Sequence, residues 1–392
     1  MIRYCKTAFA AASVVASAVM ALAIMCVGVA SAQVAPPPPA GDADASGPGA
    51  GVVIGDASLR EGARDGRGAE NNAAADEITP ELDAAVTEGL AWLAQQQLED
   101  GSWDAGRFGK NVAITSLACI AFMADGNVPG RGPYGGHVER GLDFVLDNAT
   151  ESGLIAAGDA HGPMYGHGFA TLFLGEIEGM TRGGPTSTRA SRTHEALVKA
   201  VRLIERSQND EGGWRYNPVP YDADTSVTIC QVMALRAARN AGIPVDKSVI
   251  DRAVEYVRLC QNPDGGFRYQ SEGGSSAWPR SAAGIAALFY AGVYDDASID
   301  RGLAYLNQAA LPGTGRASRA HYFYGHYYAV QAMYLAGDDS WVMWWRAARE
   351  ELLRAQLSGG SWEDSTVGAN YGTSMALIVL QMPKRYLPIF QR

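Results

Sequence analysis

A short motif recurs along this chain, and its spacing limits the folds that the chain can adopt. In each copy a glutamine is followed four residues later by glycine, then by glycine or serine, and then by an aromatic residue. The clear copies are Gln97 with Gly101-Ser102-Trp103, Gln208 with Gly212-Gly213-Trp214, Gln261 with Gly265-Gly266-Phe267, and Gln356 with Gly360-Ser361-Trp362. Weaker copies lie near Gly153-Leu154 and Leu311-Pro312-Gly313. Six copies spaced by about 50 residues indicate a repeat architecture.

Each repeat contains two helices of different character. Before the first motif, an amphipathic segment begins with a cap and first-turn proline at Thr79-Pro80 and carries Leu82, Val86, Leu90 and Leu93. After the motif, a segment is apolar on every side and carries Val112, Ile114, Leu117, Ile120 and Phe122. A helix of the second kind must be enclosed. Because six half-exposed helices can surround six enclosed ones, we expect an all-α fold, an α6/α6 toroid spanning residues 79–392.

The motif itself has a structural role in such a fold. Its glycines allow a sharp turn with positive φ between the two helices. We expect the aromatic residue to pack under this turn and tie neighbouring hairpins together, and the glutamine to cap a helix end. Trp103, Trp214, Phe267 and Trp362 are therefore assigned to the fold.

The first 78 residues differ in composition from the repeats. Arg3 and Lys6 precede an uncharged apolar stretch that ends in Ala30-Ser31-Ala32, which is typical of a signal peptide over residues 1–32. The stretch is long for a signal peptide, so an uncleaved membrane anchor stays an alternative. Residues 33–78 are rich in Ala, Gly, Asp and Pro and predict a disordered linker. The sequence thus predicts an exported protein, periplasmic or extracellular, which an anchor could hold near a membrane.

Charge and cysteine content argue against two classes of protein. The net charge is −10 and no cluster of Lys and Arg stands out, so we expect no binding of nucleic acid, which requires basic residues to neutralise phosphates. Cys119, Cys230 and Cys260 lie beyond the signal segment, too few for a disulfide framework. Each lies in a helical pattern, which favours buried single thiols over a Cys230–Cys260 bridge.

The repeats resemble those of a known family. Hairpins with this glutamine, glycine pair and aromatic residue are similar to the repeats of squalene–hopene cyclases and of protein prenyltransferase β subunits. The resemblance covers residues 79–392 and implies the toroid fold. It does not fix a function, because the same toroid also carries thioester proteins and glycan-degrading enzymes.

One segment bears on cyclase chemistry. Squalene cyclases resemble one another in an Asp-x-Asp-Asp-Thr acid at the start of an inner helix, in which the middle aspartate protonates an alkene. Aligned on Thr225, this chain reads Tyr221-Asp222-Ala223-Asp224-Thr225. Asp224 matches the last aspartate, but Ala223 stands where the resemblance places the proton donor. These cyclases also have two helical barrels, whereas this chain has the length for one.

A second comparison bears on metal chemistry. Prenyltransferase β subunits resemble one another in a zinc site made by Asp-x-Cys and a distant histidine. His326 opens an inner helix as that histidine does, but Trp278-Pro279-Arg280-Ser281 stands where Asp-x-Cys is expected. The Cys-Gly-Glu-Gln of thioester domains is also absent from the sequence. We therefore expect no metal and no cofactor.

Candidate site residues lie where the inner helices begin. In a toroid of this type these ends share one rim and face the central opening with the partial positive charge of their N-termini. Candidate catalytic residues there are Asp222, Asp224, His167 and His326. Candidate ligand-binding residues are Tyr165, Tyr216, Trp278, Arg280, Tyr324, Tyr327 and Tyr371. We hypothesise that His167, Asp224, Arg280 and His326 converge on one ligand. Structural roles compete with this hypothesis: Asp224 can be a helix cap paired with Arg280, and the histidines can be hydrogen-bonded rim residues.

Three functions fit these residues, and whether the protein is an enzyme stays open from sequence alone. The first is an exported toroid that binds an apolar ligand, such as an isoprenoid, in a central cavity. The second is a divergent terpene cyclase-like enzyme that uses Asp222 or Asp224 as an acid. The third is a glycan-acting enzyme of the lyase type, in which Arg280 neutralises a uronate. A narrow aromatic cavity would favour an isoprenoid, and an open polar cleft would favour a glycan.

Overall fold

A computed structural model describes residues 77–157, 162–180 and 187–391 of the chain. The chain divides into two units, residues 1–59 and 60–392, and every described residue belongs to the second. The expected signal segment 1–32 and residues 33–76 of the expected linker lie outside the described residues. Glu77, which the sequence assigns to the linker, is part of the packed structure, because its buried carboxylate contacts Arg346 at 2.6 Å and Arg349 at 2.9 Å.

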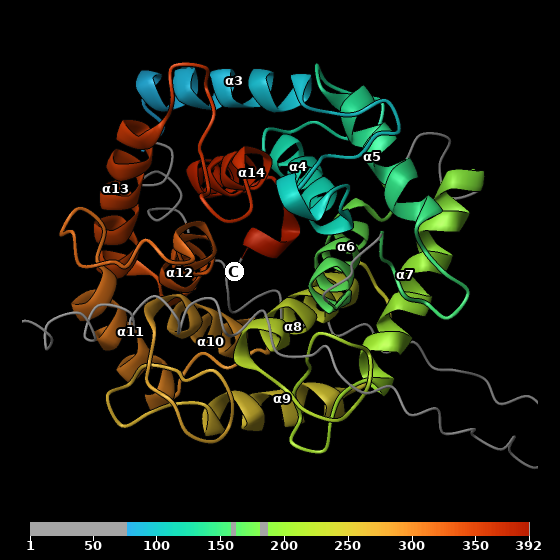
Figure 1. The fold of residues 1–392 in the computed structure, drawn as a ribbon. Coiled ribbons are helices and arrows are strands. Elements are labelled where there is room, and N and C mark those ends of the chain that lie inside the picture. Colours follow the sequence, from blue (N-terminus) through green and yellow to red (C-terminus); the bar gives the residue numbers. More distant parts are fainter. Residues whose placement is uncertain (1–76, 158–161, 181–186, 392) are drawn as a thin grey trace, which may run out of the picture. The chain divides into compact units, whose positions relative to one another are not determined.

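The described residues form twelve α-helices in two concentric rings and no strand (Figure 1). The outer ring consists of α3 (Pro80–Gln95), α5 (Gly135–Asp147), α7 (Thr188–Arg206), α9 (Lys247–Leu259), α11 (Ala297–Ala310) and α13 (Asp338–Ala355). The inner ring consists of α4 (Val112–Met123), α6 (Met164–Ile177), α8 (Thr225–Asn240), α10 (Trp278–Tyr290), α12 (Tyr322–Ala336) and α14 (Ala369–Leu380). This arrangement confirms the expected α6/α6 toroid.

The two rings differ in burial as the sequence pattern predicts. In α4 every residue from Ile114 to Met123 is buried, whereas α3 buries one stripe that includes Leu82, Val86, Leu90 and Leu93. The cap predicted at Thr79 is present, since its Oγ1 accepts a hydrogen bond from the Leu82 amide at 3.2 Å. The last inner helix, α14, packs beside the first, α4, and so closes the inner ring (Figure 1).

The glutamine of the motif joins neighbouring hairpins. Gln208 Nε2 donates to the carbonyl of Gly212 in its own turn and to that of Val249 in the next outer helix, both at 2.8 Å. The corresponding pairs of bonds are made by Gln97, Gln261 and Gln356. Gln356 reaches the carbonyl of Ala85 in α3, so this contact links the last repeat to the first. We expected the aromatic residue to tie the hairpins, and it does so together with the glutamine: Trp362 packs so closely on α3 of the next hairpin that a β-carbon on Gly89 would lie 2.9 Å from its Cζ3.

The aromatic residue also fills the interior of its own hairpin. Trp214 is 1% exposed, and its Nε1 donates to the Ile204 carbonyl of the preceding outer helix at 2.7 Å. Its amide donates to Thr228 Oγ1 of the following inner helix at 3.1 Å. Position 212, two residues before Trp214, requires glycine. Gly212 has φ +96°, and a β-carbon there would lie 2.2 Å from the Arg252 carbonyl oxygen.

An equivalent side chain in each of five inner helices accepts the hydrogen bond from the motif amide. We call these side chains the anchor residues: Thr115, His167, Thr228, Ser281 and Thr373. His167 is the anchor of the second repeat, where Ile155 replaces the motif aromatic. His326 stands at the same register in α12, in the repeat with the weakest motif.

The C-terminal segment closes one end of the inner ring. It includes the short turns η4 (Met382–Lys384) and η5 (Pro388–Phe390), and it lies inside the ring in Figure 1. Ile389 is 2% exposed, and its amide donates to Glu176 Oε2 near the end of α6 at 3.2 Å. Gln381 Nε2 donates to the Ala121 carbonyl near the end of α4 at 3.0 Å. These contacts place the C-terminal segment at the end of the ring where the inner helices end.

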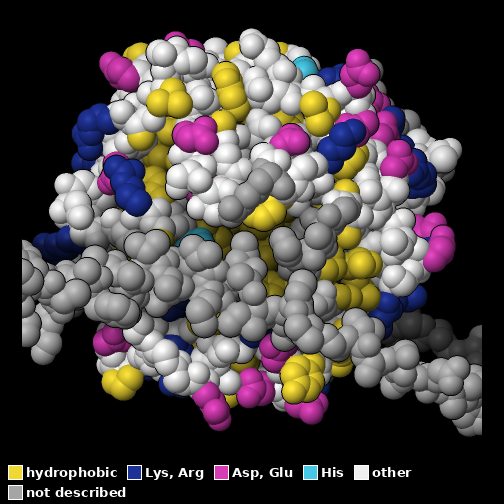
Figure 2. All heavy atoms as spheres, viewed as in Figure 1, with side chains coloured by type: hydrophobic (Ala, Val, Ile, Leu, Met, Phe, Trp, Pro, Cys, Tyr) yellow, Lys and Arg dark blue, Asp and Glu magenta, His cyan; other side chains and the backbone are white. Residues whose placement is uncertain are grey.

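Two remaining expectations concern thiols and membranes. Cys119, Cys230 and Cys260 are buried free thiols, so no Cys230–Cys260 bridge forms. None of the helices within the described residues is long and apolar enough to cross a membrane. On the face drawn in Figure 2, hydrophobic side chains gather toward the middle and charged ones lie around the periphery.

Candidate functional site

The residue two positions before each anchor points toward the axis of the ring. Two residues turn an α-helix by about 200°, so this position lies opposite the anchor, which faces the hairpin. The residues there form the mouth ring: Ala113, Tyr165, Ser226, Pro279, Tyr324 and Tyr371. All except Pro279 are partly exposed. A contact across the ring supports this assignment, since Tyr324 Oη on α12 donates to the Ser226 carbonyl on α8 at 3.2 Å.

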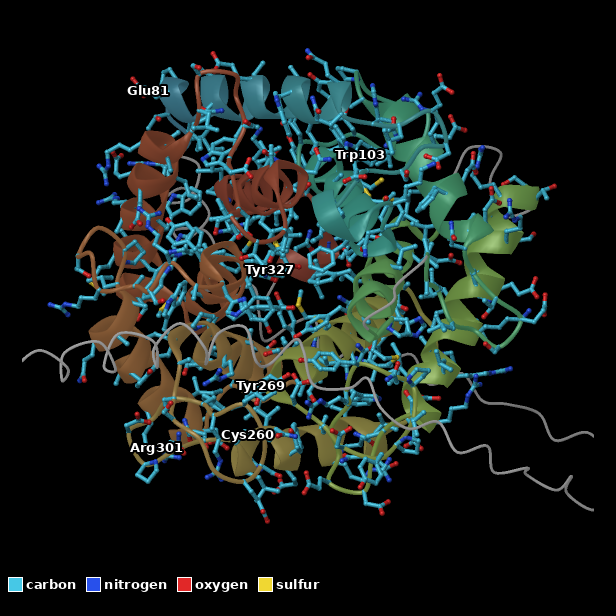
Figure 3. All side chains as sticks on the ribbon, in the orientation of Figure 1. Glu81, Trp103, Cys260, Tyr269, Arg301 and Tyr327 are labelled. Carbon is cyan, nitrogen blue, oxygen red and sulfur yellow. The ribbon has the colours of Figure 1, made fainter. Side chains whose placement is uncertain are left out.

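One turn deeper, side chains fill the interior of the ring. The residues four positions after the mouth ring form the floor ring: Leu117, Phe169, Cys230, Ala283, Tyr328 and Met375. None of them is more than 6% exposed. Tyr327, labelled inside the ring in Figure 3, packs edge to face on Phe169 of the opposite helix. The interior of the ring is therefore filled one helical turn below the mouth ring, roughly 5 Å along the helix axis.

Two tyrosines of the mouth ring carry hydroxyl groups that make no hydrogen bond within the described part of the chain. Among the described residues, neither Tyr165 Oη nor Tyr371 Oη has a hydrogen-bond partner, and both side chains are partly exposed. Burial raises the pKa of both phenols well above the usual range, because the surrounding protein disfavours the charged phenolate. Neutral phenols that remain open to solvent can donate to or accept from a ligand.

Two further tyrosines reach the mouth from the loops that precede α8 and α10. The Tyr216 carbonyl accepts from the Met164 amide at the start of α6 at 3.0 Å, and the Tyr269 carbonyl accepts from the Thr225 amide at the start of α8 at 2.9 Å. Each loop thus crosses the start of the preceding inner helix. This crossing places the Tyr216 ring 6.0 Å from that of Tyr165, and it brings the hydroxyls of Tyr216 and Tyr269 into a hydrogen bond.

Asp224 is a buried helix cap that uses only one of its two carboxylate oxygens for capping. Its Oδ1 accepts from the amides of Ser226 at 2.8 Å and Val227 at 2.9 Å, which is the capping role that the sequence offered. Its Oδ2 lies 3.4 Å from Tyr269 Oη and 3.7 Å from Arg215 Nε. The side chain has no exposed surface. Burial raises the pKa of Asp224 to about 6, although the two amides and Arg215 act in the opposite direction.

Arg215 is the cation of this cluster. Its Nη1 pairs with Asp222 Oδ2 at 2.9 Å, and Asp222 is half-exposed at the mouth. The Arg215 guanidinium also lies over the rings of Tyr216 and Tyr269, 5.0 and 5.5 Å from their centroids. The guanidinium of Arg215 therefore interacts with two carboxylates and two phenol rings. These polar groups lie together on one side of the mouth.

His167 belongs to the fold rather than to the mouth. As an anchor residue, its Nδ1 accepts from the Ile155 amide at 3.2 Å, and its Nε2 lies 3.3 Å from the Ala200 carbonyl of α7. The side chain is fully buried, and burial lowers the pKa of the imidazole to about 4, so the ring stays neutral. His167 is thus directed into its own hairpin.

His326 is likewise directed into its hairpin, and Trp278 packs against it. Their ring centroids are 5.0 Å apart, and Tyr322 and Trp344 also enclose the imidazole. Trp278 is 4% exposed and donates its Nε1 hydrogen to the Ser318 carbonyl, so it packs inside the fold. The structure therefore does not bring the two histidines together with Asp224 as we hypothesised.

The other predicted residues divide between the mouth and its surroundings. The mouth contains Tyr165, Tyr216, Tyr324, Tyr371, Asp222 and Asp224. Arg280 lies beside the mouth, 5.9 Å from the Tyr269 ring, and donates to the Ser275 carbonyl; the cation near Asp224 is Arg215 instead. Tyr327 is fully buried beside the floor ring.

Arg215 was missed as a site residue, although the sequence contains a signal for it, whereas Tyr269 is a residue that the sequence places at the rim. An Arg-Tyr pair directly follows the motif aromatic in the third and fourth repeats, as Arg215-Tyr216 and Arg268-Tyr269. The pair comes after the motif, and its members differ in role: Arg215 and both tyrosines lie at the mouth, whereas Arg268 donates to the Leu259 carbonyl of its own hairpin.

Two observations concern the proton donor of squalene cyclases and the zinc site of prenyltransferase β subunits. Ala223, which is 3% exposed and has no acidic group, stands where the resemblance places the proton donor of a cyclase. Among the described residues, no group of three His, Cys, Asp or Glu side chains is placed to hold a metal ion.

Known structures share this architecture. No family model matches the chain, and no curated protein matches it. The type II terpene cyclase MstE from Scytonema is similar with a TM-score of 0.52 at 15% identity, covering 78% of this chain and 99% of that one. A sugar epimerase from a ruminal bacterium has a TM-score of 0.56 at 14% identity, covering 78% and 98%. A GH76 α-mannanase from Bacteroides thetaiotaomicron has a TM-score of 0.55 at 11% identity, covering 81% and 98%. These likenesses show an α/α toroid fold, and the function must be argued from the site.

Proposed function

We propose that the mouth of this toroid binds a single sugar ring, either a monosaccharide or the end of a glycan. The observation that carries the proposal is the pair of mouth-ring tyrosines, Tyr165 and Tyr371, which are partly exposed and whose hydroxyls have no hydrogen-bond partner among the described residues. A sugar presents C–H groups that pack on aromatic faces and hydroxyls that need hydrogen-bond partners, and the tyrosines of the mouth offer both. Two proteins that share the fold, the sugar epimerase and the α-mannanase, have names that refer to carbohydrates, which supports the same class.

The filled interior of the ring argues against the apolar ligand that we considered first. A long isoprenoid chain needs an apolar channel that continues past the floor ring. The floor ring is buried, and the contact between Phe169 and Tyr327 lies across that path. A ligand that contacts only the mouth suits one sugar ring better than a long chain.

A cyclase-like acid is also less well supported. Ala223 stands at the proton donor's position in a tightly packed environment. Asp224 has no exposed surface, so it cannot touch a ligand directly. A ligand of the mouth instead meets tyrosine hydroxyls, Asp222 and Arg215.

Export is part of the proposal, because it decides which sugars the protein meets. The support is the small-x-small site Ala30-Ser31-Ala32 after an apolar stretch. Expression of the full chain followed by N-terminal sequencing of the exported protein tests it. We expect a mature N-terminus at Gln33, whereas an intact N-terminus would identify a membrane anchor.

Isothermal titration calorimetry of the purified protein tests ligand binding. The ligands are neutral hexoses, hexuronates and, as the apolar alternative, geranylgeraniol in detergent. We expect a hexose or hexuronate to bind, and Tyr165→Phe and Tyr371→Phe each to weaken binding by about 2- to 12-fold, since a hydrogen bond contributes about 0.5–1.5 kcal/mol. Tyr386→Phe is the matched control, because this phenol is 60% exposed in the C-terminal segment that closes the other end of the inner ring. Failure of every sugar to bind, or unchanged binding by both Phe variants, would overturn the proposal.

A further inference from the structure

The hydroxyls of Tyr269 and Tyr216 connect buried Asp224 to the mouth. Tyr269 Oη lies 3.4 Å from Asp224 Oδ2 and is hydrogen-bonded to Tyr216 Oη. Tyr216 is partly exposed, and its ring lies 6.0 Å from that of Tyr165 in the mouth ring. Asp224, Tyr269 and Tyr216 thus form a continuous chain, which runs from a carboxyl group without exposed surface to a phenol beside the mouth ring.

We propose that this chain is a proton relay, in which Tyr216 donates a proton to a sugar at the mouth, Tyr269 reprotonates Tyr216, and Asp224 reprotonates Tyr269. The identity of the acceptor rests on the proposed function. Tyr216 is the candidate catalytic residue, because it ends the chain and its ring lies 6.0 Å from that of Tyr165 in the mouth ring. Tyr269 and Asp224 act through it and are positioning residues.

The surroundings of Asp224 suit both states that a relay requires. In the protonated state the carboxyl is held in a buried environment, where burial raises its pKa to about 6. In the ionised state its charge is stabilised by the amides of Ser226 and Val227 and by Arg215 at 3.7 Å. The same guanidinium lies over both phenol rings, so it stabilises negative charge along the whole relay.

The other titratable groups near Asp224 do not compete for its proton. They are Tyr165 of α6, Cys230 of α8, Tyr256 of α9 and Tyr324 of α12. Burial raises the pKa of each of these groups, so each stays neutral near pH 6. Asp222 and Arg215 are the charged neighbours at the mouth, and they are paired with each other at 2.9 Å.

The simplest reaction that one proton donor promotes on a sugar is opening of the hemiacetal ring. The Tyr216 proton passes to the ring oxygen, and the bond between that oxygen and the anomeric carbon breaks with its electron pair going to oxygen. The anomeric hydroxyl loses its proton to water as the carbonyl forms. Solvent returns a proton to Asp224, so the step needs neither an oxidant nor a reductant. Such general acid catalysis typically contributes about 10²- to 10⁴-fold in rate.

Carbon-13 NMR titration of the full chain, labelled at aspartate carboxyls and tyrosine Cζ, tests the relay without any ligand. We expect the Asp224 carboxyl to titrate near pH 6 and the Cζ resonances of Tyr269 and Tyr216 to follow with the same midpoint. Asp224→Asn should abolish the titration while keeping the helix cap, since asparagine is an equally good N-cap. Tyr269→Phe should leave Asp224 titrating and uncouple Tyr216.

Two results of this titration would overturn the relay. One is a Tyr216 resonance that does not follow Asp224 in the unchanged protein. The other is a Tyr216 resonance that follows Asp224 equally well in Tyr269→Phe, which would show a through-space effect rather than proton coupling. Neither result depends on whether a sugar binds, so failure of the proposed function and failure of the relay can be told apart.

Exchange NMR between the α and β anomers of a sugar that binds tests the catalytic step. We expect the protein to accelerate anomer exchange and Tyr216→Phe to lower the acceleration at least 10-fold. Asp224→Asn should lower the rate and flatten its pH profile around pH 6. Tyr386→Phe, far along the chain from the relay, should retain the full rate. No acceleration by the unchanged protein, or full acceleration by Tyr216→Phe, would contradict the assignment.

Discussion

The side chains of Phe169 and Tyr327 meet edge to face across the axis of the inner ring, with their centroids 6.1 Å apart. They come from α6 and α12, which lie on opposite sides of the ring in Figure 1. Side chains from opposite helices can meet only if the interior is filled at that level. The pair thus lies between the mouth ring and the end where the C-terminal segment packs. A ligand bound at the mouth ring would therefore not extend past this pair.

Removal of this contact should open the floor. Phe169→Ala deletes a side chain that is 6% exposed, and we expect it to lower the free energy of unfolding by about 3–5 kcal/mol in urea titrations. It should also allow geranylgeraniol to bind where the unchanged protein does not. Phe144→Ala in α5 is the control, because this residue is similarly buried at 8% exposure but belongs to the outer ring. Loss of stability without a gain of apolar binding would show that the floor does not set ligand class.

The anchor residues should contribute strongly to stability. Thr228 is fully buried and accepts the Trp214 amide hydrogen bond at 3.1 Å. Thr228→Val keeps the shape but leaves that amide without a partner, so we expect a loss of about 1–3 kcal/mol in the free energy of unfolding. Thr87→Val in α3 removes a hydroxyl whose bond to the Asp83 carbonyl is exposed, and it should change stability by less than about 0.5 kcal/mol. Equal effects of the two substitutions would contradict the anchor role.

The repeat carries most of the information about the fold. Each copy of the motif specifies a turn, and the change from an amphipathic to an apolar helix specifies which ring each helix joins. The tyrosines of the mouth could be placed for the same reason, since Tyr165, Tyr324 and Tyr371 share one register near the start of an inner helix.

The rest of the site could not be placed in this way. His167 shares its register with Thr115, Thr228 and Thr373, but sequence alone does not reveal that this register faces the hairpin. Arg215 reaches Asp224 because a loop crosses a neighbouring helix, and loop paths of this kind are set by tertiary packing. The closure of the ring by the C-terminal segment has no repeat signal at all.

Acid should destabilise the protein through its buried histidines. Burial lowers the pKa of His326 to about 4, while the unfolded chain has the ordinary value of 6.5. The unfolded state therefore binds more protons between these values, and stability is lost as pH falls from about 6.5 to about 4. Neither ring nitrogen of His326 has a hydrogen-bond partner among the described residues, so His326→Phe removes the titration without leaving a partner unpaired.

We expect His326→Phe to lower the midpoint of acid unfolding, with a gain on the order of 3 kcal/mol near pH 4 relative to neutral pH. Circular dichroism across pH 3–7 measures the transition. His194→Phe is the control, since its side chain is 58% exposed and pairs with Glu178 at the surface. An unchanged acid midpoint in His326→Phe would show that this histidine is hydrated in the folded state.

Glu176 should make the closed end of the ring sensitive to alkaline pH. Its carboxyl is 2% exposed, its Oε2 accepts from the Ile389 amide, and its Oε1 is buried without a partner among the described residues. Burial raises the pKa from the ordinary 4.5 to about 8. The folded state thus retains a proton that the unfolded chain releases, so stability falls as pH rises from about 4.5 to about 8. This effect is on the order of 4 kcal/mol, and the phenols of Tyr290 and Tyr327 face the same carboxyl.

Glu176→Gln should remove this dependence. An amide carries no charge at any of these pH values, so the variant should be more stable than the unchanged protein at pH 9, and the difference should shrink toward pH 5. Urea titrations across pH 5–9 measure the free energy of unfolding, and tryptic cleavage after Arg385 reports release of the C-terminal segment. Glu178→Gln is the matched control, because this carboxylate lies just beyond α6 and pairs with His194 at 2.9 Å. If both variants keep the slope of the unchanged protein, the carboxyl of Glu176 is solvated and does not hold the segment in place.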